Sequence, residues 1–430
     1  MAKRGRGGMM QVLLNGRLVG QLRLARSGAI SFTYDPNWLA WQHAMPISLS
    51  LPLREEAYHG GPVIAYLENL LPDNQAIRER VAAKVRAEGT DAWHILEKIG
   101  RDCVGALQFV SGEVPEAPAL QGEPVDDVQI AAMLRNLASA PLGLDAEGDF
   151  RISIAGAQEK TALLRYDGKW LRPTGLTPTT HILKTQIGEL PSGINLSDSV
   201  ENEYFCMSFC RKMGAEVAEV EIADFEDVRS LVVTRFDRQW TGAGRLIRLP
   251  QEDFCQALGI APSQKYQTDG GPGFSDGIAL LEGSDTPELD RRALFRAQAL
   301  FWLLGATDGH AKNFSIALRP GGFRMTPLYD VLSAQKAVDD GQIRQNRMRL
   351  AMTIDGHYQV NEIVPRHFLQ AARAAGFGVA LAEEVLKDIA ARIDAALADT
   401  MATLPAGFPT DLAESIANGI RTRAAGIALG

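Results

Sequence analysis

The amino-acid sequence predicts an α+β protein with a mixed α/β N-terminal part and a mainly α-helical C-terminal part. Two features lead to this prediction. Before residue 251, short apolar runs are separated by turn residues, whereas after it apolar residues recur mostly at helical spacing. The chain has 430 residues, of which 46% are hydrophobic and 22% charged, so it can form large cores in two or three domains.

The first predicted domain is an α/β module over residues 1–110. Strands are expected within residues 10–35, because Asn15-Gly16 stands between two apolar runs and favours a tight hairpin turn. Helices are expected over residues 63–71 and 75–99, where apolar residues follow helical spacing. The module therefore combines a small sheet with helices.

A linker with a short helix is predicted next, over residues 111–148. Prolines and glycines are frequent from 111 to 127, and a helical pattern follows at 127–138. Residues 149–236 form the next predicted domain, with a helix at 201–213 and several short strands. These strands are expected at 151–154, 161–166, 169–171, 181–183, 217–222 and 231–234.

Residues 237–430 complete the chain as a mainly helical domain. Two exceptions are expected in it. One is a glycine-rich loop at 269–273, and the other is a hairpin over 314–325, where Gly321-Gly322 separates two apolar runs. From residue 364 onward the sequence is rich in alanine, which favours helix.

The charge and the apolar runs exclude several classes of protein. Lys and Arg number 44 and Asp and Glu 52, so the formal net charge is −8. A protein that binds nucleic acid by itself normally has a basic excess, because it neutralises phosphates. No run reaches the length of a membrane-spanning helix. The basic start at residues 1–8 precedes a broken apolar run, so we expect no signal peptide there, but a frayed terminus or an arm that touches phosphate.

The cysteines predict a reducing environment. They show no CxxC spacing and are too few for a disulfide framework, and no nearby histidine completes a metal site. We therefore expect buried free thiols and a cytoplasmic protein. The four residues are Cys103, Cys206, Cys210 and Cys255.

The most informative segment is residues 305–315, GATDGHAKNFS. Asp308 and Asn313 are separated by four residues, as in the catalytic loop of protein kinases. In that loop the Asp reaches the acceptor hydroxyl, and the Asn oxygen binds Mg²⁺ on the nucleotide phosphates. Asp330 follows the predicted hairpin, where a kinase places a second metal ligand. The pattern predicts ATP and Mg²⁺ as cofactors, and its alternative is a turn or helix cap.

A phosphate-binding region is predicted upstream of this loop. Lys184 ends a strand-like run, where a lysine can contact nucleotide phosphates, and the alternative is a strand-end lysine in solvent. Small residues in 153–161, SIAGAQEKT, let backbone amides approach phosphate, and Lys160 adds positive charge. This segment is not a Walker A loop. The order of the parts along the chain is nevertheless that of a kinase.

Residues 231–238, LVVTRFDR, have the pattern of a buried strand that runs into a turn. They follow a helix that carries Glu201 and Glu203, and they precede the catalytic loop. This is where a kinase joins its lobes and binds adenine through the backbone. For the side chains of Arg235 and Asp237 two interpretations stay open, a local ion pair or contacts with a ligand.

With these motifs in place, the chain resembles the HipA toxin kinases of bacterial type II toxin–antitoxin systems. The similarity extends in order from about residue 10 to 335 and includes YLENLLP at residues 66–72, which is similar to the N-terminal signature of the family. The other matching stretches are 151–164, 178–184, 231–238, 249–256, 265–273, 305–315 and 327–333.

The resemblance implies a protein-kinase-like fold with two lobes, the smaller over residues 149–236 and the larger over 237–430. It implies that Asp308 is the catalytic base and that Asn313 and Asp330 bind Mg²⁺. The residues that it implies for binding ATP are Ala155, Gly156, Ala157, Gln158, Glu159, Lys160, Lys184, Thr234, Arg235, Phe236, His310, Lys312 and Tyr329.

Ser153 matches the serine that family members autophosphorylate, a change linked to ejection of the phosphate loop and loss of activity. Its alternative role is that of a strand-end serine bonded to its own backbone. A phosphorylated Ser153 would carry about −1.5 to −2 charges and compete with ATP for Lys184. One departure from the family is Thr234, where better-known members have an acidic residue, and the backbone contact with adenine should survive it.

The resemblance implies a serine/threonine-protein kinase toxin that arrests growth and is linked to persistence. Its implied substrate is glutamyl-tRNA synthetase, and the first alternative is a kinase for a different protein. Its implied partner is a small dimeric DNA-binding antitoxin, through which the acidic chain reaches operator DNA. The second alternative is a chain that acts chiefly as the antitoxin-bound corepressor of its own operon. We expect no membrane partner.

Overall fold

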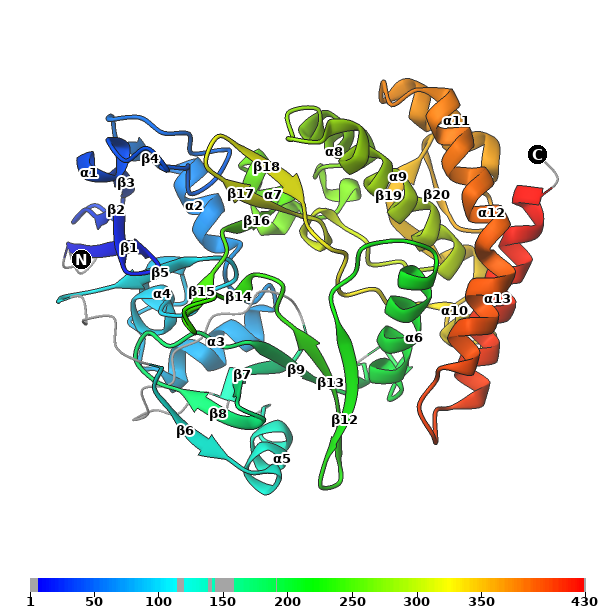
Figure 1. The fold of residues 1–430 in the computed structure, drawn as a ribbon, viewed down its shortest axis with the longest axis horizontal. Coiled ribbons are helices and arrows are strands. Elements are labelled where there is room, and N and C mark those ends of the chain that lie inside the picture. Colours follow the sequence, from blue (N-terminus) through cyan, green and yellow to red (C-terminus); the bar gives the residue numbers. More distant parts are fainter. Residues whose placement is uncertain (1–6, 114–119, 138–140, 144–157, 191, 429–430) are drawn as a thin grey trace.

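The computed structural model describes residues 7–113, 120–137, 141–143, 158–190 and 192–428 (Figure 1). The N-terminal module, in blue, lies on one side of the molecule, and the long helices of the C-terminal half, in orange and red, lie on the other. A sheet in cyan and green lies below and between them. The arrangement brings three parts of the chain around one central region.

The N-terminal module contains a five-stranded antiparallel sheet in the order β4-β3-β2-β1-β5. Asn15 and Gly16 form the turn between β1 and β2 with φ angles of 50° and 85°, which confirms the predicted hairpin. The elements are β1 Gly8–Leu14, β2 Arg17–Leu24, β3 Ile30–Tyr34, β4 Tyr58–His59 and β5 Leu107–Val110, with helices α1 Pro36–Leu39, α2 Gly61–Glu68, α3 Gln75–Lys84 and α4 Ala92–Ile99.

The predicted helix over 75–99 is two helices in the structure. Arg86, just after α3, has a φ of 54°, a left-handed conformation that ends a helix. Asp91 then accepts a hydrogen bond from the His94 amide and forms the N-cap of α4. The prediction missed this break because arginine is not a turn signal.

The smaller lobe contains a six-stranded sheet in the order β12-β13-β9-β7-β8-β6. All of its neighbouring strands are antiparallel. The elements are β6 Gly122–Val125, β7 Lys160–Tyr166, β8 Lys169–Pro173, β9 His181–Thr185, β12 Val220–Phe225 and β13 Val228–Thr234, with α5 Asp127–Arg135, α6 Ser199–Lys212 and the short pair β10 Gly188–Glu189 and β11 Asn195–Leu196.

Part of the predicted linker belongs to this sheet. β6 pairs with β8 at the edge of the sheet, and α5 buries Ile130 and Leu134 against side chains of the sheet. Pro124 lies in β6, and an edge strand tolerates proline because only one side of it forms hydrogen bonds. The proline content that suggested a linker is therefore compatible with an edge strand. The strand predicted at 151–154 lies outside the described residues.

The larger lobe is mainly helical, as predicted. Its helices are α7 Phe254–Leu258, α8 Phe274–Leu281, α9 Pro287–Leu304, α10 Gln335–Asp339, α11 Pro365–Ala374, α12 Val379–Ala402 and α13 Thr410–Ala428. Its strands are β14 Arg238–Trp240, β15 Leu246–Arg248, β16 Gln251–Asp253, β17 Ser315–Arg319, β18 Gly322–Met325, β19 Arg349–Ile354 and β20 His357–Gln359.

The hairpin of β17 and β18 confirms the prediction for residues 314–325, and the sequence did not predict β16, β19 or β20. β16 consists of three polar residues, Gln-Glu-Asp, and becomes a strand by pairing with β17 across a long separation in sequence. Such pairing depends on tertiary contact, so no local sequence pattern predicts it.

One continuous core joins the N-terminal module to the larger lobe. Its buried side chains include Trp38 and Leu71 of the module, together with Phe254, Leu300 and Ile420 of the lobe. The four cysteines are buried and free, as predicted. This shared core fixes the module against the region where the catalytic loop lies.

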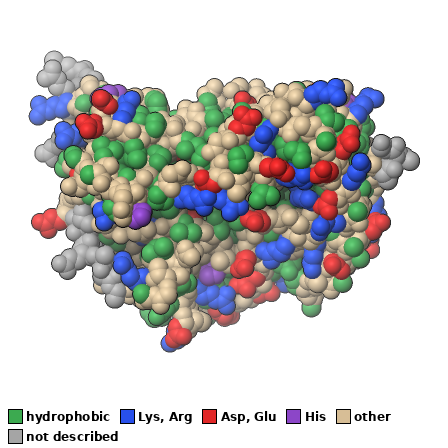
Figure 2. All heavy atoms as spheres, turned by 45° about the horizontal axis from the view of Figure 1, so that its top comes forward, with side chains coloured by type: hydrophobic (Ala, Val, Ile, Leu, Met, Phe, Trp, Pro, Cys, Tyr) green, Lys and Arg blue, Asp and Glu red, His purple; other side chains and the backbone are tan. Residues whose placement is uncertain are grey.

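The surface carries charges of both signs. Acidic and basic side chains are interspersed over the face drawn in Figure 2. No helix in the described part of the chain is long and apolar enough to cross a membrane.

Candidate active site

A cleft of about 1050 Å³, including its open mouth, lies where the three parts of the chain meet. The smaller lobe lines it with residues of β7, β9, α6 and β13. The larger lobe contributes the loop after α9 and the segment after β18, and the N-terminal module contributes the segment after α2. Its charged and amide side chains include Asn69, Asp73, Lys160, Lys184, Glu203, Asp308, Lys312, Asn313 and Asp330.

Lys184 lies at the centre of a buried charge cluster in this cleft. Its Nζ is 2.8 Å from Oε1 of Glu203 on α6 and 2.6 Å from Oδ1 of Asp330. Burial alone would lower the pKa of Lys184, but the two carboxylates outweigh it and raise that pKa. Lys184 is thus a permanent cation, and the structure contradicts the alternative of a lysine in solvent.

The predicted catalytic loop begins at the C-terminus of α9. Gly305 ends the helix with a φ of 64°, and the chain then passes Asp308 and the 3₁₀ turn Ala311–Asn313 before it enters β17. The Asp308 side chain lies at the solvent-accessible mouth of the cleft. The surrounding protein raises the pKa of Asp308, and a hydrogen bond of 2.6 Å from the Tyr266 hydroxyl to Oδ1 opposes that rise.

Asn313 and Asp330 lie next to each other in the cleft. The Asn313 amide nitrogen is 3.5 Å from the backbone oxygen of Asp330, whose φ of 61° is in the left-handed region. Oδ1 of Asn313 is buried and has no hydrogen-bond partner among the described residues. Burial would raise the pKa of Asp330, but Lys184 and Lys160 hold it well below its usual range.

These two residues fit a magnesium ion. Asn313 offers a free buried oxygen, and Asp330 offers an ionised carboxylate beside it. Mg²⁺ is commonly bound by one or two such protein oxygens plus phosphates and water. The described residues contain no group of three His, Cys, Asp or Glu side chains that could hold a metal. The donor set therefore suits an ion that arrives with a nucleotide.

Further buried polar atoms of the cleft lack a partner among the described residues. They are Oε1 of Gln251 and Nδ1 of His310, whereas Oδ1 of Asp73 has no hydrogen bond but forms an ion pair with Lys312 at 3.6 Å. Burial, followed by Lys265, lowers the pKa of His310 to about 3, so this imidazole is neutral. Buried polar groups normally form hydrogen bonds, and their concentration in one cleft indicates a polar ligand.

Two predicted ATP-binding lysines have different environments. Lys160 faces Lys184 directly across β7 and β9, and burial, opposed by Asp330, lowers its pKa to about 8. The Lys312 Nζ is 2.8 Å from Oδ1 of Asn69 and 3.2 Å from Oδ2 of Asp253. Lys312 therefore ties the catalytic loop to the N-terminal module, while Lys160 is available to a ligand.

The described part of the predicted phosphate loop contains Gln158 and Glu159. Gln158 donates a hydrogen bond of 2.7 Å to the Thr185 carbonyl, and Glu159 forms an ion pair with Arg80 of α3. Both contacts attach the end of this loop to its neighbours. The remaining predicted residues of the loop, Ala155, Gly156 and Ala157, and the predicted autophosphorylation site Ser153 lie outside the described residues.

The hinge after β13 contains Thr234, Arg235 and Phe236. The Arg235 amide donates to the Thr180 carbonyl at 2.9 Å, whereas among the described residues the Thr234 carbonyl and the Phe236 amide have no partner. The Tyr329 ring packs on Phe236 at 5.9 Å between centroids, and the Tyr329 hydroxyl donates to the Lys312 carbonyl at 2.8 Å. The hinge thus offers one free acceptor and one free donor beside an aromatic wall.

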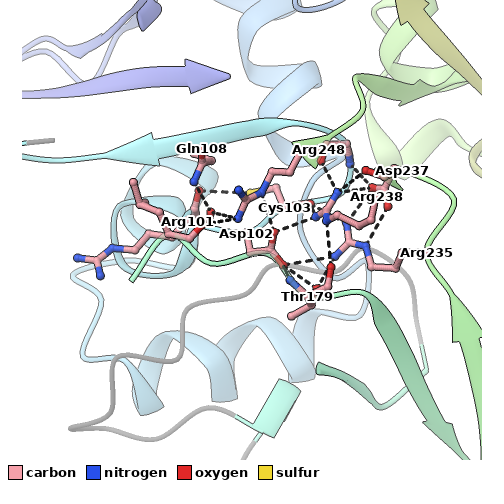
Figure 3. A network of polar contacts seen from close by, with 12 residues as sticks. Arg101, Asp102, Cys103, Gln108, Thr179, Arg235, Asp237, Arg238 and Arg248 are labelled. Carbon is pink, nitrogen blue, oxygen red and sulfur yellow. Dashed lines mark hydrogen bonds and ion pairs between the residues drawn. The ribbon is translucent and has the colours of Figure 1, made fainter. Parts of the chain in front are cut away.

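Arg235 lines the cleft, and its side chain belongs to a buried network, drawn in Figure 3. Its Nε is 3.0 Å from Oδ1 of Asp237, so of the two interpretations for this pair the ion pair is correct. We call this group the arginine–aspartate network. Its members are Asp102, Thr179, Arg235, Asp237, Arg238 and Arg248.

Several residues of the cleft were not assigned a role from the sequence. Glu203 was noted only as an acidic residue of a helix, and Asn69 and Tyr266 lie in matching stretches to which no role was given. For Asp73, the sequence showed only that it directly follows the matching stretch at residues 66–72. The contacts of these residues join separate elements, and those of Asn69 and Asp73 cross between domains, so a local pattern cannot reveal them.

The fold and the cleft define the class of protein. Two lobes meet at a hinge, a lysine pairs with a helix carboxylate, and an Asp and an Asn lie on the loop after a helix, which is the arrangement of a kinase. The family model described as the HipA-like C-terminal domain matches residues 152–397, and the one described as the HipA N-terminal domain matches residues 10–110. The chain therefore belongs to the HipA family, as its sequence predicted.

Individual relatives agree with this assignment. A putative kinase, Y4mE of Sinorhizobium fredii, is 35% identical over 87% of this chain and 87% of its own. The serine/threonine-protein kinase toxin HipA of Shewanella oneidensis is 28% identical over 92% of this chain and 90% of its own. The solved complex of Shewanella oneidensis HipA, HipB and operator DNA contains a chain that superposes with a TM-score of 0.81 at 25% identity, covering 98% of this chain and 97% of that one. The predicted kinase-like fold is confirmed.

Proposed function

We propose that this protein is a toxin that transfers the γ-phosphoryl group of ATP to a serine or threonine of another protein. The Lys184 ion pairs with Glu203 and Asp330 carry this proposal. They place a permanent cation, an ionised carboxylate and the free oxygen of Asn313 in one cleft. A triphosphate with its metal ion supplies the partners that these groups lack.

ATP binds with its adenine at the hinge and its phosphates beside the two lysines. The Thr234 carbonyl accepts from the exocyclic amine of adenine, and the Phe236 amide donates to a ring nitrogen. Ile182 and Val233 face the base, and Lys184 and Lys160 contact the phosphates. Because these adenine contacts use the backbone, threonine at 234 in place of an acidic residue does not prevent them.

Asn313 and Asp330 would hold Mg²⁺ together with the phosphates of ATP. The ion neutralises charge on the β- and γ-phosphates when it is bound. Lys184 assists by holding Asp330 in its ionised form, and Glu203 fixes Lys184 from the other side. His310 stays neutral, so it adds no charge that would compete with the ion.

Asp308 acts as the catalytic base. Its Oδ1 is occupied by the Tyr266 hydroxyl, so Oδ2 accepts the proton of the substrate hydroxyl. The substrate oxygen then bonds to the γ-phosphorus, the bond from that phosphorus to the β–γ bridging oxygen breaks, and ADP leaves with that oxygen. The products are ADP and a phosphorylated serine or threonine.

The substrate and the control of the activity follow from the family. We propose glutamyl-tRNA synthetase as the substrate whose phosphorylation arrests growth, and a different protein as the alternative. We also propose that the enzyme inactivates itself by phosphorylating Ser153. The new dianion would compete with ATP for Lys184, a permanent cation of the cleft.

A second role as a corepressor is proposed from the solved relative, which is a complex with HipB and operator DNA. A small antitoxin would supply the phosphate contacts, because this chain has a net charge of −8. Gel shifts of operator DNA test this role. The chain should shift DNA only with the antitoxin, and a shift by the chain alone would contradict it.

The kinase proposal is tested by transfer of radioactive γ-phosphate from ATP to purified glutamyl-tRNA synthetase and to proteins of a cell lysate. Wild type should label the synthetase, and Asp308→Asn should not. Asp394→Asn, which changes an exposed aspartate of α12 away from the cleft, is the matched control and should behave as wild type.

Each outcome addresses a different part of the proposal. Asp308-dependent labelling of another lysate protein would show that glutamyl-tRNA synthetase is not the substrate, while the proposed kinase activity would stand. No Asp308-dependent label anywhere would contradict the kinase activity. Mass spectrometry of the enzyme after incubation with ATP should find phosphate on Ser153, and a Ser153→Asp variant that binds ATP as tightly as wild type would contradict the proposed self-inactivation.

A further inference from the structure

The segment from Lys265 to Gly273 matches the family, and the function proposed above uses one contact of it, the hydrogen bond from Tyr266 to Asp308. It precedes α8 and contains the 3₁₀ turn Gln267–Asp269. Tyr266 of this segment contacts two residues of the catalytic loop. Its hydroxyl donates to Oδ1 of Asp308 at 2.6 Å, and its ring packs edge-on against His310 at 4.9 Å between centroids.

The backbone of the segment places Tyr266 firmly against the catalytic loop. The Tyr266 carbonyl accepts from the amides of Asp269 and Gly271, each at 3.0 Å. Gly271 is required in this tight turn, because a Cβ there would lie 1.7 Å from the Gln264 carbonyl oxygen. The turn is thus closed on itself and fixes the direction of the Tyr266 side chain.

The segment is also anchored on both sides of Tyr266. The Lys265 Nζ donates to Oδ2 of Asp73 at 2.9 Å, and the Lys265 carbonyl accepts from the Ala311 amide of the catalytic loop. Gln267 accepts from the Thr353 amide at 2.7 Å through Oε1. Tyr266 is therefore attached to the N-terminal module, to the catalytic loop and to the larger lobe.

The hydrogen bond between Tyr266 and Asp308 has a defined direction. Burial and the Asp308 charge both raise the pKa of Tyr266, so the proton stays on the phenol and the carboxylate is the acceptor. This bond favours the ionised form of Asp308, against the surrounding protein, which favours the protonated form. Among the described residues nothing donates to Oδ2 of Asp308, so that oxygen remains for the substrate.

We propose that Tyr266 is a positioning residue for the phosphoryl transfer: its hydroxyl fixes Oδ1 of Asp308 and directs Oδ2 to the substrate hydroxyl. The inference rests on the proposed role of Asp308 as the base. Tyr266 itself touches neither the nucleotide nor the transferred group in this scheme. It acts through Asp308 alone.

The test is Tyr266→Phe, which removes the hydroxyl and keeps the ring against His310. Phosphate transfer from ATP to glutamyl-tRNA synthetase, or to casein if the synthetase takes no label, should show kcat about 10-fold to 100-fold lower. The KM for ATP should stay within about twofold, because the nucleotide contacts are unchanged. The acidic limb of kcat/KM against pH should move to higher pH, because the bond that favours the carboxylate is lost.

Tyr58→Phe is the matched control, because it removes a hydroxyl that bonds to the Pro52 carbonyl far from the cleft. It should leave kcat and the pH profile unchanged. A merely structural role for Tyr266 would lower the melting temperature without moving the acidic limb. The proposal is overturned if Tyr266→Phe keeps the wild-type kcat and pH profile, or if its loss is matched by Tyr58→Phe. Failure of the kinase proposal is distinct, because wild type itself would then transfer no phosphate to either acceptor.

Discussion

Two buried groups of charged side chains within this protein differ in how completely they are bonded. In the arginine–aspartate network, Asp102 accepts from Arg238 at 2.8 Å and from Arg248 at 2.9 Å through Oδ1, and from Thr179 through Oδ2 (Figure 3). Among the described residues, no buried side-chain nitrogen or oxygen of the network lacks a hydrogen bond. The cleft differs, because Asn313, His310 and Gln251 each have a buried atom without a hydrogen-bond partner among the described residues.

The difference separates a structural cluster from a binding site. Burial alone would raise the pKa of Asp102, but Arg238, Arg248 and Arg235 hold it well below its usual range. Each charged side chain of the network thus has partners inside the protein, and the network joins the N-terminal module to the hinge. The cleft has polar atoms whose partners must come from outside. Four substitutions test this difference between the network and the cleft.

The largest effect is expected for activity at the cleft. Asp308→Asn should lower kcat by about 10²–10⁴-fold, because the base is removed. Its unfolding midpoint in urea should stay at the wild-type value, since Asp308 lies at the open mouth of the cleft and not in a saturated network. Kinase assays and urea unfolding of the same preparation measure both. A large loss of stability would make Asp308 a structural residue.

The opposite pattern is expected in the network. Asp102→Asn leaves three buried guanidiniums with one carboxylate and should lower the free energy of unfolding by about 3–5 kcal/mol. Urea unfolding should give a lower midpoint with the same slope. At low temperature the folded fraction should retain kcat, because Asp102 does not line the cleft. A loss below about 1 kcal/mol would contradict the network's structural role.

A third substitution concerns a carboxylate that belongs to neither group. Glu252 is buried, its Oε1 accepts from the Leu49 amide at 2.8 Å, and its Oε2 has no partner among the described residues. Burial raises its pKa from an ordinary 4.5 to about 8. The folded protein therefore binds this proton more tightly than the unfolded chain, and stability falls as pH rises from about 4.5 to about 8.

Glu252→Gln should remove that pH dependence, because glutamine does not titrate. Between pH 5 and pH 7.5, we expect the free energy of unfolding of the variant to rise by about 2–3 kcal/mol relative to that of the wild type. Urea unfolding at the two pH values measures the difference. If the free energy of unfolding of the variant and of the wild type changed with pH in the same way, the prediction would be wrong, because Glu252 would then bind its proton equally well in the folded and unfolded chain.

The smallest effect is expected at the surface. Glu384 forms an ion pair with Arg292 and its side chain is 61% exposed. Glu384→Gln should change the free energy of unfolding by less than about 0.5 kcal/mol, because exposed ion pairs are screened by water. It is also the charge-removal control for Asp102→Asn. A change as large as in the network would remove the distinction between buried and exposed pairs.

Local patterns were sufficient for much of the fold. The hairpin at Asn15-Gly16, the helical tail and the hairpin of β17 and β18 each follow from residues close together in sequence. The edge strand β6 and the polar strand β16 do not, because they exist only through pairing with distant strands. Proline in β6 even suggested a linker, although an edge position tolerates it.

In the candidate site too, some features could be predicted from the sequence and others could not. Asp308 and Asn313 lie on one loop, so their spacing already predicts that both can face one ligand. The partners of Lys184 could not be predicted from spacing, because Asp330 is 146 residues away. The Arg235 side chain belongs to the network, and only its partners Asp237, Thr179 and Cys103 decide this.

The amino-acid sequence was enough to predict the family, the order of the kinase-like parts, the buried thiols and the loop that carries Asp308 and Asn313. These are properties of local pattern and of ordered motifs along the chain. The folded chain was needed to show that Lys184 lies between Glu203 and Asp330, that the N-terminal module reaches Lys312, and that Tyr266 contacts Asp308. The reason is physical: each of these contacts joins groups far apart in sequence, and it forms only when the shared core has brought their elements together.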